Sequence, residues 1–166
     1  MSYPRPTTAS GLSWGVKRTF RRYIQGDPSG SVWPTGGAEF DERAFMATWP
    51  LVDHRDGPSD GFTLFFQGRI RFTAHFGMLD LALTDPTLEL APSRGTGPRT
   101  AAIRVSGVAE PILKLRPERV ERTDLREVWV ASEANLTPSG SALFGGSYPP
   151  GQPMDPLIFV IAAPHE

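Results

Sequence analysis

Residues 69–83 read RIRFTAHFGMLDLAL, and apolar and polar side chains alternate along most of this segment. Successive side chains of a β-strand point to opposite faces, so the pattern predicts two neighbouring strands, Arg69–Phe76 and Met78–Thr84, with a turn at Gly77 between them. His75 falls on the polar face of the first strand. The residues expected on its apolar face are Ile70, Phe72, Ala74 and Phe76.

Other segments also have the apolar pattern of short strands. Glycine and proline, each present 17 times, separate most of these segments by turns. The segments are Ala38–Thr48, Phe62–Gln67, Thr87–Leu90, Ala101–Val108, Ile112–Leu115, Leu125–Ala134, Ser141–Phe144 and Leu157–Ala162. Residues 27–37 and 92–99 are expected to form the longer surface loops. About ten short strands predict a mainly β fold, either an antiparallel β-sandwich or a partly open barrel.

One segment has helical spacing instead. Ser10 is a suitable N-cap, and Gly26 followed by Asp27-Pro28 is a suitable end, so we predict one N-terminal amphipathic helix over about residues 11–25. Its apolar stripe would consist of Leu12, Val16, Phe20, Tyr23 and Ile24.

Composition excludes several classes of function. The chain has 166 residues and a formal net charge of -1, from 17 basic and 18 acidic residues, so no overall positive field attracts nucleic acid. The absence of cysteine excludes disulfides, thiolate catalysis and cysteine-ligated metals. No apolar run is long enough to span a membrane, and the first ten residues lack the apolar core of a signal peptide. As written, the chain is expected to be soluble and cytoplasmic, without membrane insertion.

Few residues suggest chemistry by pattern alone. The chain has no phosphate-binding glycine loop and no His-Glu-x-x-His zinc helix. Its three histidines are His54, His75 and His165, and a three-histidine metal site would need His165 from an expected frayed tail. Tyr23 has two interpretations: a core tyrosine with one hydrogen-bond partner, or a residue that binds a ligand.

Three segments occur in a recognisable order. They read LSWGVKRTFRRYI (residues 12–24), GRIRFTAHFGMLDL (residues 68–81) and FGGSYPPG followed by MDPL (within residues 144–157). Together they resemble the HtaA-type haem-uptake domain of actinobacterial cell envelopes. That family has a Trp-Gly-Val-Lys helix leading to a tyrosine, and a strand reading G-x-V-x-F-x-G-H-x-G-x-L-D-L. The resemblance implies a flexible lead over residues 1–10 and a single haem-binding domain over residues 11–163.

The resemblance also implies a site. Tyr23 would be the axial ligand of ferric haem b, so the metal would be bound through the haem iron, and His75 would hydrogen-bond the ligand oxygen. Tyrosinate is an established haem ligand, and such a hydrogen bond favours the ionised phenol. Ala74 stands where the family has glycine. Further candidates for the haem pocket or the propionates are Thr19, Phe20, Phe76, Met78 and Tyr148.

Three functions remain open at this point. The leading hypothesis is a non-catalytic carrier that takes haem from a donor protein or passes it to an acceptor, with a haem-linked homodimer as a further expectation. The second is a peroxidase-like or catalase-like enzyme, for which His54 is the spare histidine for distal acid–base chemistry. The third is an interaction module that keeps the fold without haem. Family members are usually exported or envelope-associated, which contrasts with the cytoplasmic expectation.

Overall fold

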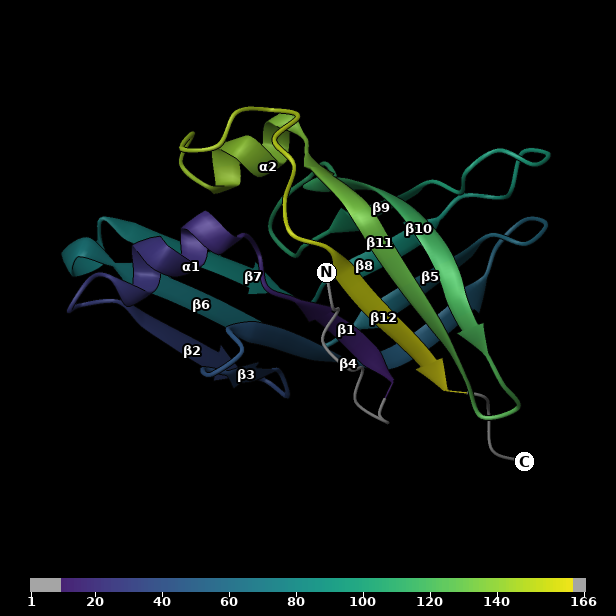
Figure 1. Ribbon diagram of the computed structural model, residues 1–166, viewed down its shortest axis with the longest axis horizontal. Helices are drawn as coiled ribbons and strands as arrows, with labels where there is room; N and C mark the ends of the chain where they lie inside the picture. The colour runs from purple at the N-terminus through teal and green to yellow at the C-terminus, as the bar shows by residue number, and fades with distance from the viewer. Residues whose placement is uncertain (1–9, 163–166) are drawn as a thin grey trace.

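The structure is a computed structural model that describes residues 10–162. Its strands are β1 (Gly11–Trp14), β2 (Ser31–Thr35), β3 (Glu39–Asp41), β4 (Met46–Asp56), β5 (Phe62–Phe66), β6 (Arg69–Ala74), β7 (Leu79–Thr84), β8 (Thr87–Leu90), β9 (Ala101–Arg104), β10 (Leu113–Arg122), β11 (Arg126–Leu136) and β12 (Leu157–Ala162) (Figure 1). The helices are α1 (Arg18–Gln25), α2 (Pro138–Leu143) and a single turn of 3-10 helix, η1 (His75–Gly77). No helix within this range is long and apolar enough to cross a membrane.

Eight antiparallel strands form a closed barrel, and β3 is an extra strand paired with β4. The order around the ring is β1-β12-β11-β10-β9-β8-β5-β4, and pairing of β1 with β4 completes it. Leu12 of β1 lies opposite Phe159 on one side and Trp49 on the other. The prediction of a mainly β fold is confirmed. The larger sheet is a barrel rather than a sandwich, and it is closed rather than partly open.

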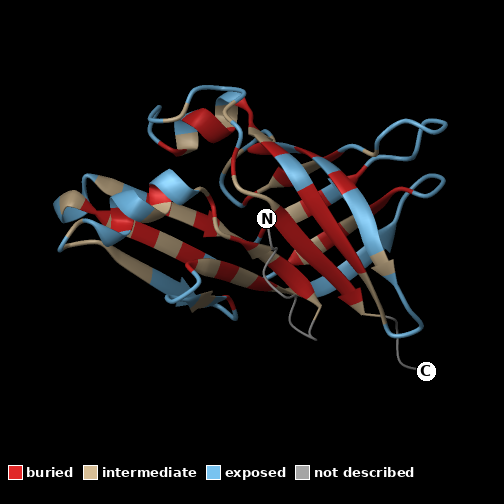
Figure 2. Cartoon of the chain, viewed as in Figure 1, coloured by how far each residue is buried: buried red, intermediate tan, exposed pale blue. Residues whose placement is uncertain are grey.

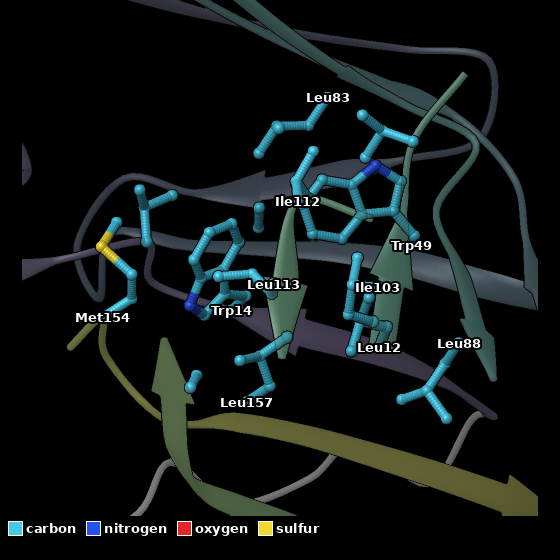
Figure 3. Close-up of a cluster of buried hydrophobic side chains, with 14 of the residues drawn as sticks. Leu12, Trp14, Trp49, Leu83, Leu88, Ile103, Ile112, Leu113, Met154 and Leu157 are labelled. Carbon is cyan, nitrogen blue, oxygen red and sulfur yellow. The ribbon is translucent and has the colours of Figure 1, made fainter. Parts of the chain in front are cut away.

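Large side chains fill the barrel interior. Trp14 from β1 and Trp49 from β4 lie among apolar side chains from strands of the ring, from β7 and from the segments next to the strands (Figure 3). The labelled neighbours are Leu12, Leu83, Leu88, Ile103, Ile112, Leu113, Met154 and Leu157. An eight-stranded barrel is just wide enough for its own side chains to fill it. The interior is therefore a packed core, and Figure 2 shows it as bands of buried residues along the strands.

A smaller antiparallel sheet of order β2-β6-β7 extends from the barrel (Figure 1). Phe72 of β6 lies opposite Leu81 of β7, so the two strands predicted from the alternation of residues 69–83 are confirmed as a pair. Helix α1 covers the apolar face of this sheet. The Phe20 ring meets the Phe72 ring edge-on, with centroids 5.1 Å apart.

The chain crosses between the two sheets twice, and the two crossing points are hydrogen-bonded to each other. The chain leaves the barrel at Gly68, before β6, and returns to it at Asp85, after β7. The Gly68 N–H donates to the Asp85 carboxylate, and the Asp85 N–H donates to the Gly68 carbonyl, each at 2.8 Å. Gly68 has φ +120°, and a β-carbon there would lie 2.4 Å from the backbone nitrogen of Ala38. Only glycine fits this crossing.

The predicted helix over residues 11–25 is wrong in its first half. Its end at Gln25 is confirmed, with Gly26 as C-cap, but the helix begins at Arg18, and residues 11–14 form β1. Leu12 and Trp14, two residues apart, both point into the barrel, as alternate residues of a strand do. The four-residue spacing of Leu12 and Val16 therefore did not indicate a helix. Ser10 is not the N-cap, because its Oγ accepts a hydrogen bond from the Ala162 N–H at 2.8 Å.

Three other expectations need correction. Residues 141–143 belong to α2 rather than to a strand, because Pro138 starts the helix and the Thr137 hydroxyl caps it by accepting from the Gly140 N–H at 3.0 Å. The strand expected over residues 38–48 is divided by a turn into β3 and the start of β4. The loop expected over residues 27–37 contains β2. The predicted flexible lead lies outside the described residues, apart from Ser10.

Replacing the buried Trp49 tests the packed barrel. Trp49 is 1% exposed, and its indole N–H has no partner within residues 10–162, so Trp49→Ala removes packing without breaking a hydrogen bond seen there. We expect a loss of about 3–5 kcal/mol in the free energy of unfolding, measured by urea denaturation. Val52→Ala, on the exposed part of the same strand, should stay within about 0.5 kcal/mol of wild type. Equal losses in both variants would contradict a packed interior around Trp49.

Candidate functional site

The candidate site lies outside the barrel, where α1 faces the turn between β6 and β7. Tyr23 of α1 and His75 of η1 are in contact, with ring centroids 4.3 Å apart and ring planes inclined by 42°. Tyr23 is 48% exposed, whereas its helix neighbours Phe20 and Ile24 are each 3% exposed. Tyr23 is thus not part of the buried apolar stripe that the sequence suggested. The two buried neighbours anchor the helix and leave the phenol at the surface.

His75 is presented by an unusual turn. Strand β6 ends at Ala74, and His75 and Phe76 follow with φ values of 52° and 55°, in the left-handed region that non-glycine residues rarely adopt. The strand predicted to reach Phe76 therefore ends two residues early. Phe76, expected on the buried face of that strand, is 94% exposed, and Met78 is 90% exposed.

The imidazole of His75 has an unusual environment. Its Nε2 atom is buried beside Tyr23 and has no hydrogen-bond partner among residues 10–162. Buried polar atoms in folded proteins nearly always have a partner, so this nitrogen indicates a missing one. A ligand that draws the Tyr23 oxygen toward the imidazole would supply it.

Side chains of Asp27 and Ser29 hold the turn in place. The Asp27 carboxylate accepts hydrogen bonds from the His75 N–H and, at 2.6 Å, from the Ser29 hydroxyl. The Ser29 oxygen in turn accepts from the Phe76 N–H at 3.0 Å. Two hydrogen bonds hold the pKa of Asp27 below its ordinary value, because both favour the charged carboxylate. The bond from the Ser29 hydroxyl has the larger effect, and the bond from the His75 N–H has the smaller one.

Residues 144–151, part of the third segment that resembles the family, reach α1 from the other side. The hydroxyls of Thr19 and Tyr148 are 2.8 Å apart. Thr19 precedes Tyr23 by four residues, so both lie on the same side of the helix. Phe20 lies between Phe72 and Phe144 in the core, which places it beneath the site rather than at its surface.

His54 belongs to another part of the molecule. It lies near the end of β4, with Nε2 3.4 Å from the Asp56 carboxylate, beside a hollow of about 810 Å³ at the end of the barrel whose lining includes no residue of α1. The next residues, 57–61, read GPSDG and match the spacing of a hydrolase nucleophile elbow. They form an exposed turn between two strands, not the strand-to-helix turn that such an elbow requires.

The site offers an oxygen donor rather than a cage for a bare metal ion. Over the described range, no group of three or more His, Cys, Asp or Glu side chains could hold a metal. A metal bound at Tyr23 would therefore need to bring most of its own ligands. The surroundings suit a flat apolar ligand with a polar edge, because exposed Phe76 and Met78 lie at one side and the paired hydroxyls of Thr19 and Tyr148 at the other.

Sequence reasoning found most of these residues but missed Asp27 and Ser29. Both fall in the segment interpreted as a surface loop. Their local signal is the Asp-Pro-Ser order after the helix end, since Asp and Ser side chains commonly bond nearby main-chain groups. That signal could not show that these side-chain oxygens accept hydrogen bonds from the N–H groups of residues 75 and 76, which lie far along the chain.

Several solved structures of known proteins are similar to this chain. The C-terminal domain of HtaA from Corynebacterium glutamicum has a TM-score of 0.66 and 24% identity, over 93% of this chain and 97% of that one. The N-terminal domain of that HtaA gives 0.65 and 20%, over 96% and 100%. The haem-binding protein HtaB from the same organism gives 0.66 and 17%, over 93% and 95%. These likenesses show the fold.

A search of curated proteins finds no match. The family model described as Htaa, in contrast, matches residues 9–160. This match spans nearly the whole chain, and it includes all three segments on which the resemblance was based. The chain belongs to the HtaA family.

Proposed function

We propose that this protein binds ferric haem through the Tyr23 oxygen and carries it to or from a partner protein. The observation that supports this proposal is the exposed Tyr23 phenol beside the buried, unpartnered Nε2 of His75. Family membership supports haem as the ligand, and the similar HtaB structure is described as that of a haem-binding protein. The proposed unit is the single domain of residues 11–163.

The chemistry of the ligand follows from the two side chains. A free phenol ionises only near pH 10, so at neutral pH tyrosinate needs stabilisation. Fe(III) supplies most of it as a Lewis acid, and a hydrogen bond donated by His75 Nε2 to the phenolate oxygen supplies more. This bond would also give the orphaned nitrogen its partner. We propose haem b as the ligand; with no cysteine in the chain, the porphyrin would not be attached by thioether bonds.

The remaining candidates would contact the porphyrin at different places. Phe76 and Met78 are apolar and almost fully exposed, so they would cover porphyrin surface that water otherwise contacts. The hydroxyls of Thr19 and Tyr148 would donate to a propionate, exchanging their mutual hydrogen bond for bonds to a charged acceptor. Phe20 would act from below by holding α1 on the sheet.

A carrier fits this site better than an enzyme. Peroxidase-like or catalase-like chemistry needs an acid–base group over the open face of the haem, and His54 lies at the far end of the barrel. An open face would also permit a haem-linked homodimer. One similar structure is a domain-swapped dimer of an HtaA domain variant, which supports testing the oligomeric state with and without haem.

Titration of the apo-protein with hemin tests the ligand. Wild type should bind one haem with the visible spectrum of a high-spin ferric tyrosinate complex. Tyr23→Phe removes only the oxygen, and we expect affinity to fall by at least about 100-fold, more than the loss of a supporting residue. Tyr148→Phe is the matched control and should lower affinity less than about tenfold, as one lost propionate hydrogen bond. A Tyr23→Phe variant with wild-type affinity and spectrum would refute the assignment.

A second titration separates His75 from His54. His75→Ala should weaken hemin binding by about 10–100-fold and alter the tyrosinate band, because the phenolate loses its hydrogen-bond donor. His54→Ala should leave both the affinity and the band unchanged. If His54→Ala abolished a peroxide turnover that exceeds that of free hemin, the enzyme hypothesis would replace the carrier.

Reduction of the iron tests the carrier mechanism. Phenolate is an anionic oxygen ligand that prefers Fe(III) to Fe(II). We therefore expect haem to transfer to apomyoglobin at least about tenfold faster from the dithionite-reduced complex than from the ferric complex. Stopped-flow absorbance measures both rates. Equal transfer rates from both oxidation states would mean that the Tyr23–iron bond does not control release.

A further inference from the structure

We propose that Asp27 and Ser29 form a clamp that positions His75 against Tyr23, a role that rests on the haem function proposed above. The clamp is defined as the Asp27 carboxylate and the Ser29 hydroxyl together. Neither residue would touch haem. Each would act through the main chain of the turn that carries the imidazole.

The clamp satisfies two successive N–H groups of the turn. The Asp27 carboxylate takes the His75 N–H, and the Ser29 oxygen takes the Phe76 N–H at 3.0 Å. The Ser29 hydroxyl also donates to the same carboxylate at 2.6 Å, so the two side chains hold each other. One serine oxygen thus acts as donor and as acceptor, which fixes the direction of its hydrogen.

The turn needs such support because of its backbone conformation. His75 and Phe76 both have left-handed φ values, which are sterically unfavourable for residues with a β-carbon. Phe76 is 94% exposed, so packing does not hold it in this conformation. Strained residues persist where surrounding contacts determine them, and here the hydrogen bonds of the clamp add to the bond that the Met78 N–H donates to the His75 carbonyl at 3.1 Å.

The position of the clamp links the two functional side chains. Asp27 follows Gly26, the C-cap of the helix that carries Tyr23. Ile24, on the same helix turn, is buried, so this end of the helix is fixed against the sheet. The segment that carries the phenol therefore also holds the backbone of the imidazole. Asp27 binds the main-chain N–H of His75 and not the ring, and the ring Nε2 has no partner among the described residues.

The barrel contains a closely matched pair for use as a control. Asp60 accepts hydrogen bonds from both the N–H of Ser93, at 2.8 Å, and its hydroxyl, at 2.7 Å. As at Asp27, a serine hydroxyl lowers the pKa of the aspartate, but this pair ties together two loops at the end of the barrel. Asp60→Ala and Ser93→Ala therefore remove a matching Asp–Ser pair away from Tyr23, although Asp60→Ala also removes an ion pair with Arg99.

The first measurement uses the apo-protein. Hydrogen exchange followed by NMR should show the His75 and Phe76 amides exchanging about tenfold faster in Asp27→Ala and Ser29→Ala, the equivalent of one hydrogen bond. The Phe72 amide, in the middle of β6, should be unchanged. Ser29→Thr keeps the hydroxyl and should restore wild-type exchange. Unchanged exchange at residues 75 and 76 would overturn the clamp whether or not the protein binds haem.

The second measurement uses hemin and a double-mutant cycle. Asp27→Ala should weaken hemin binding about tenfold and shift the tyrosinate band in the same direction as His75→Ala. Combined with His75→Ala, it should add nothing further, because the clamp acts only through that residue. Additive losses, or a band unaffected by Asp27→Ala, would overturn the positioning role. Absence of hemin binding by wild type would instead overturn the haem site, with the exchange result still deciding the clamp.

Discussion

The whole arrangement depends on the paired crossings at Gly68 and Asp85. These two residues hydrogen-bond each other at the point where the chain leaves the barrel and where it returns. Their hydrogen bonds fix the base of the β6–β7 hairpin. From there the two strands pair regularly, from Arg69↔Thr84 to Ala74↔Leu79 beside the turn. His75 begins where this pairing stops. The imidazole is therefore placed by a rigid ladder whose origin lies at a glycine that no other residue could replace.

The barrel supports the site without containing it. Trp14, Trp49 and their apolar neighbours form its core (Figure 3). The candidate residues instead gather where α1, η1 and the segment after α2 meet at the surface. A ligand held there keeps one side open. An open side would suit the proposed transfer between proteins, because a partner could contact the ligand before this protein releases it.

Local patterns in the sequence predicted part of this structure. Alternation predicted β6 and β7, and Gly26 marked the end of α1. Alternation could not show where a strand stops, so Phe76 was placed on the buried face although the backbone turns left-handed one residue earlier. Spacing could not distinguish β1 from a helix, because its role depends on partners near residues 47–50 and 157–160. The Asp27–His75 contact joins residues far apart in sequence, which no local pattern encodes.

The insertion of β1 between β4 and β12 has a consequence for the order of folding. Gly11 pairs with Val160, and Trp14 donates to the carbonyl of Asp155 at 2.9 Å, so the two ends of the described chain meet at the base of α1. The segments bearing Tyr23 and His75 emerge from the ribosome long before β12 does. Contacts of such long range form late, because closing a long loop costs chain entropy before any contact compensates for it. A nascent chain thus contains Tyr23 and His75 before the ring that supports them has closed, and under the proposed function haem binding would become possible only once β12 has paired.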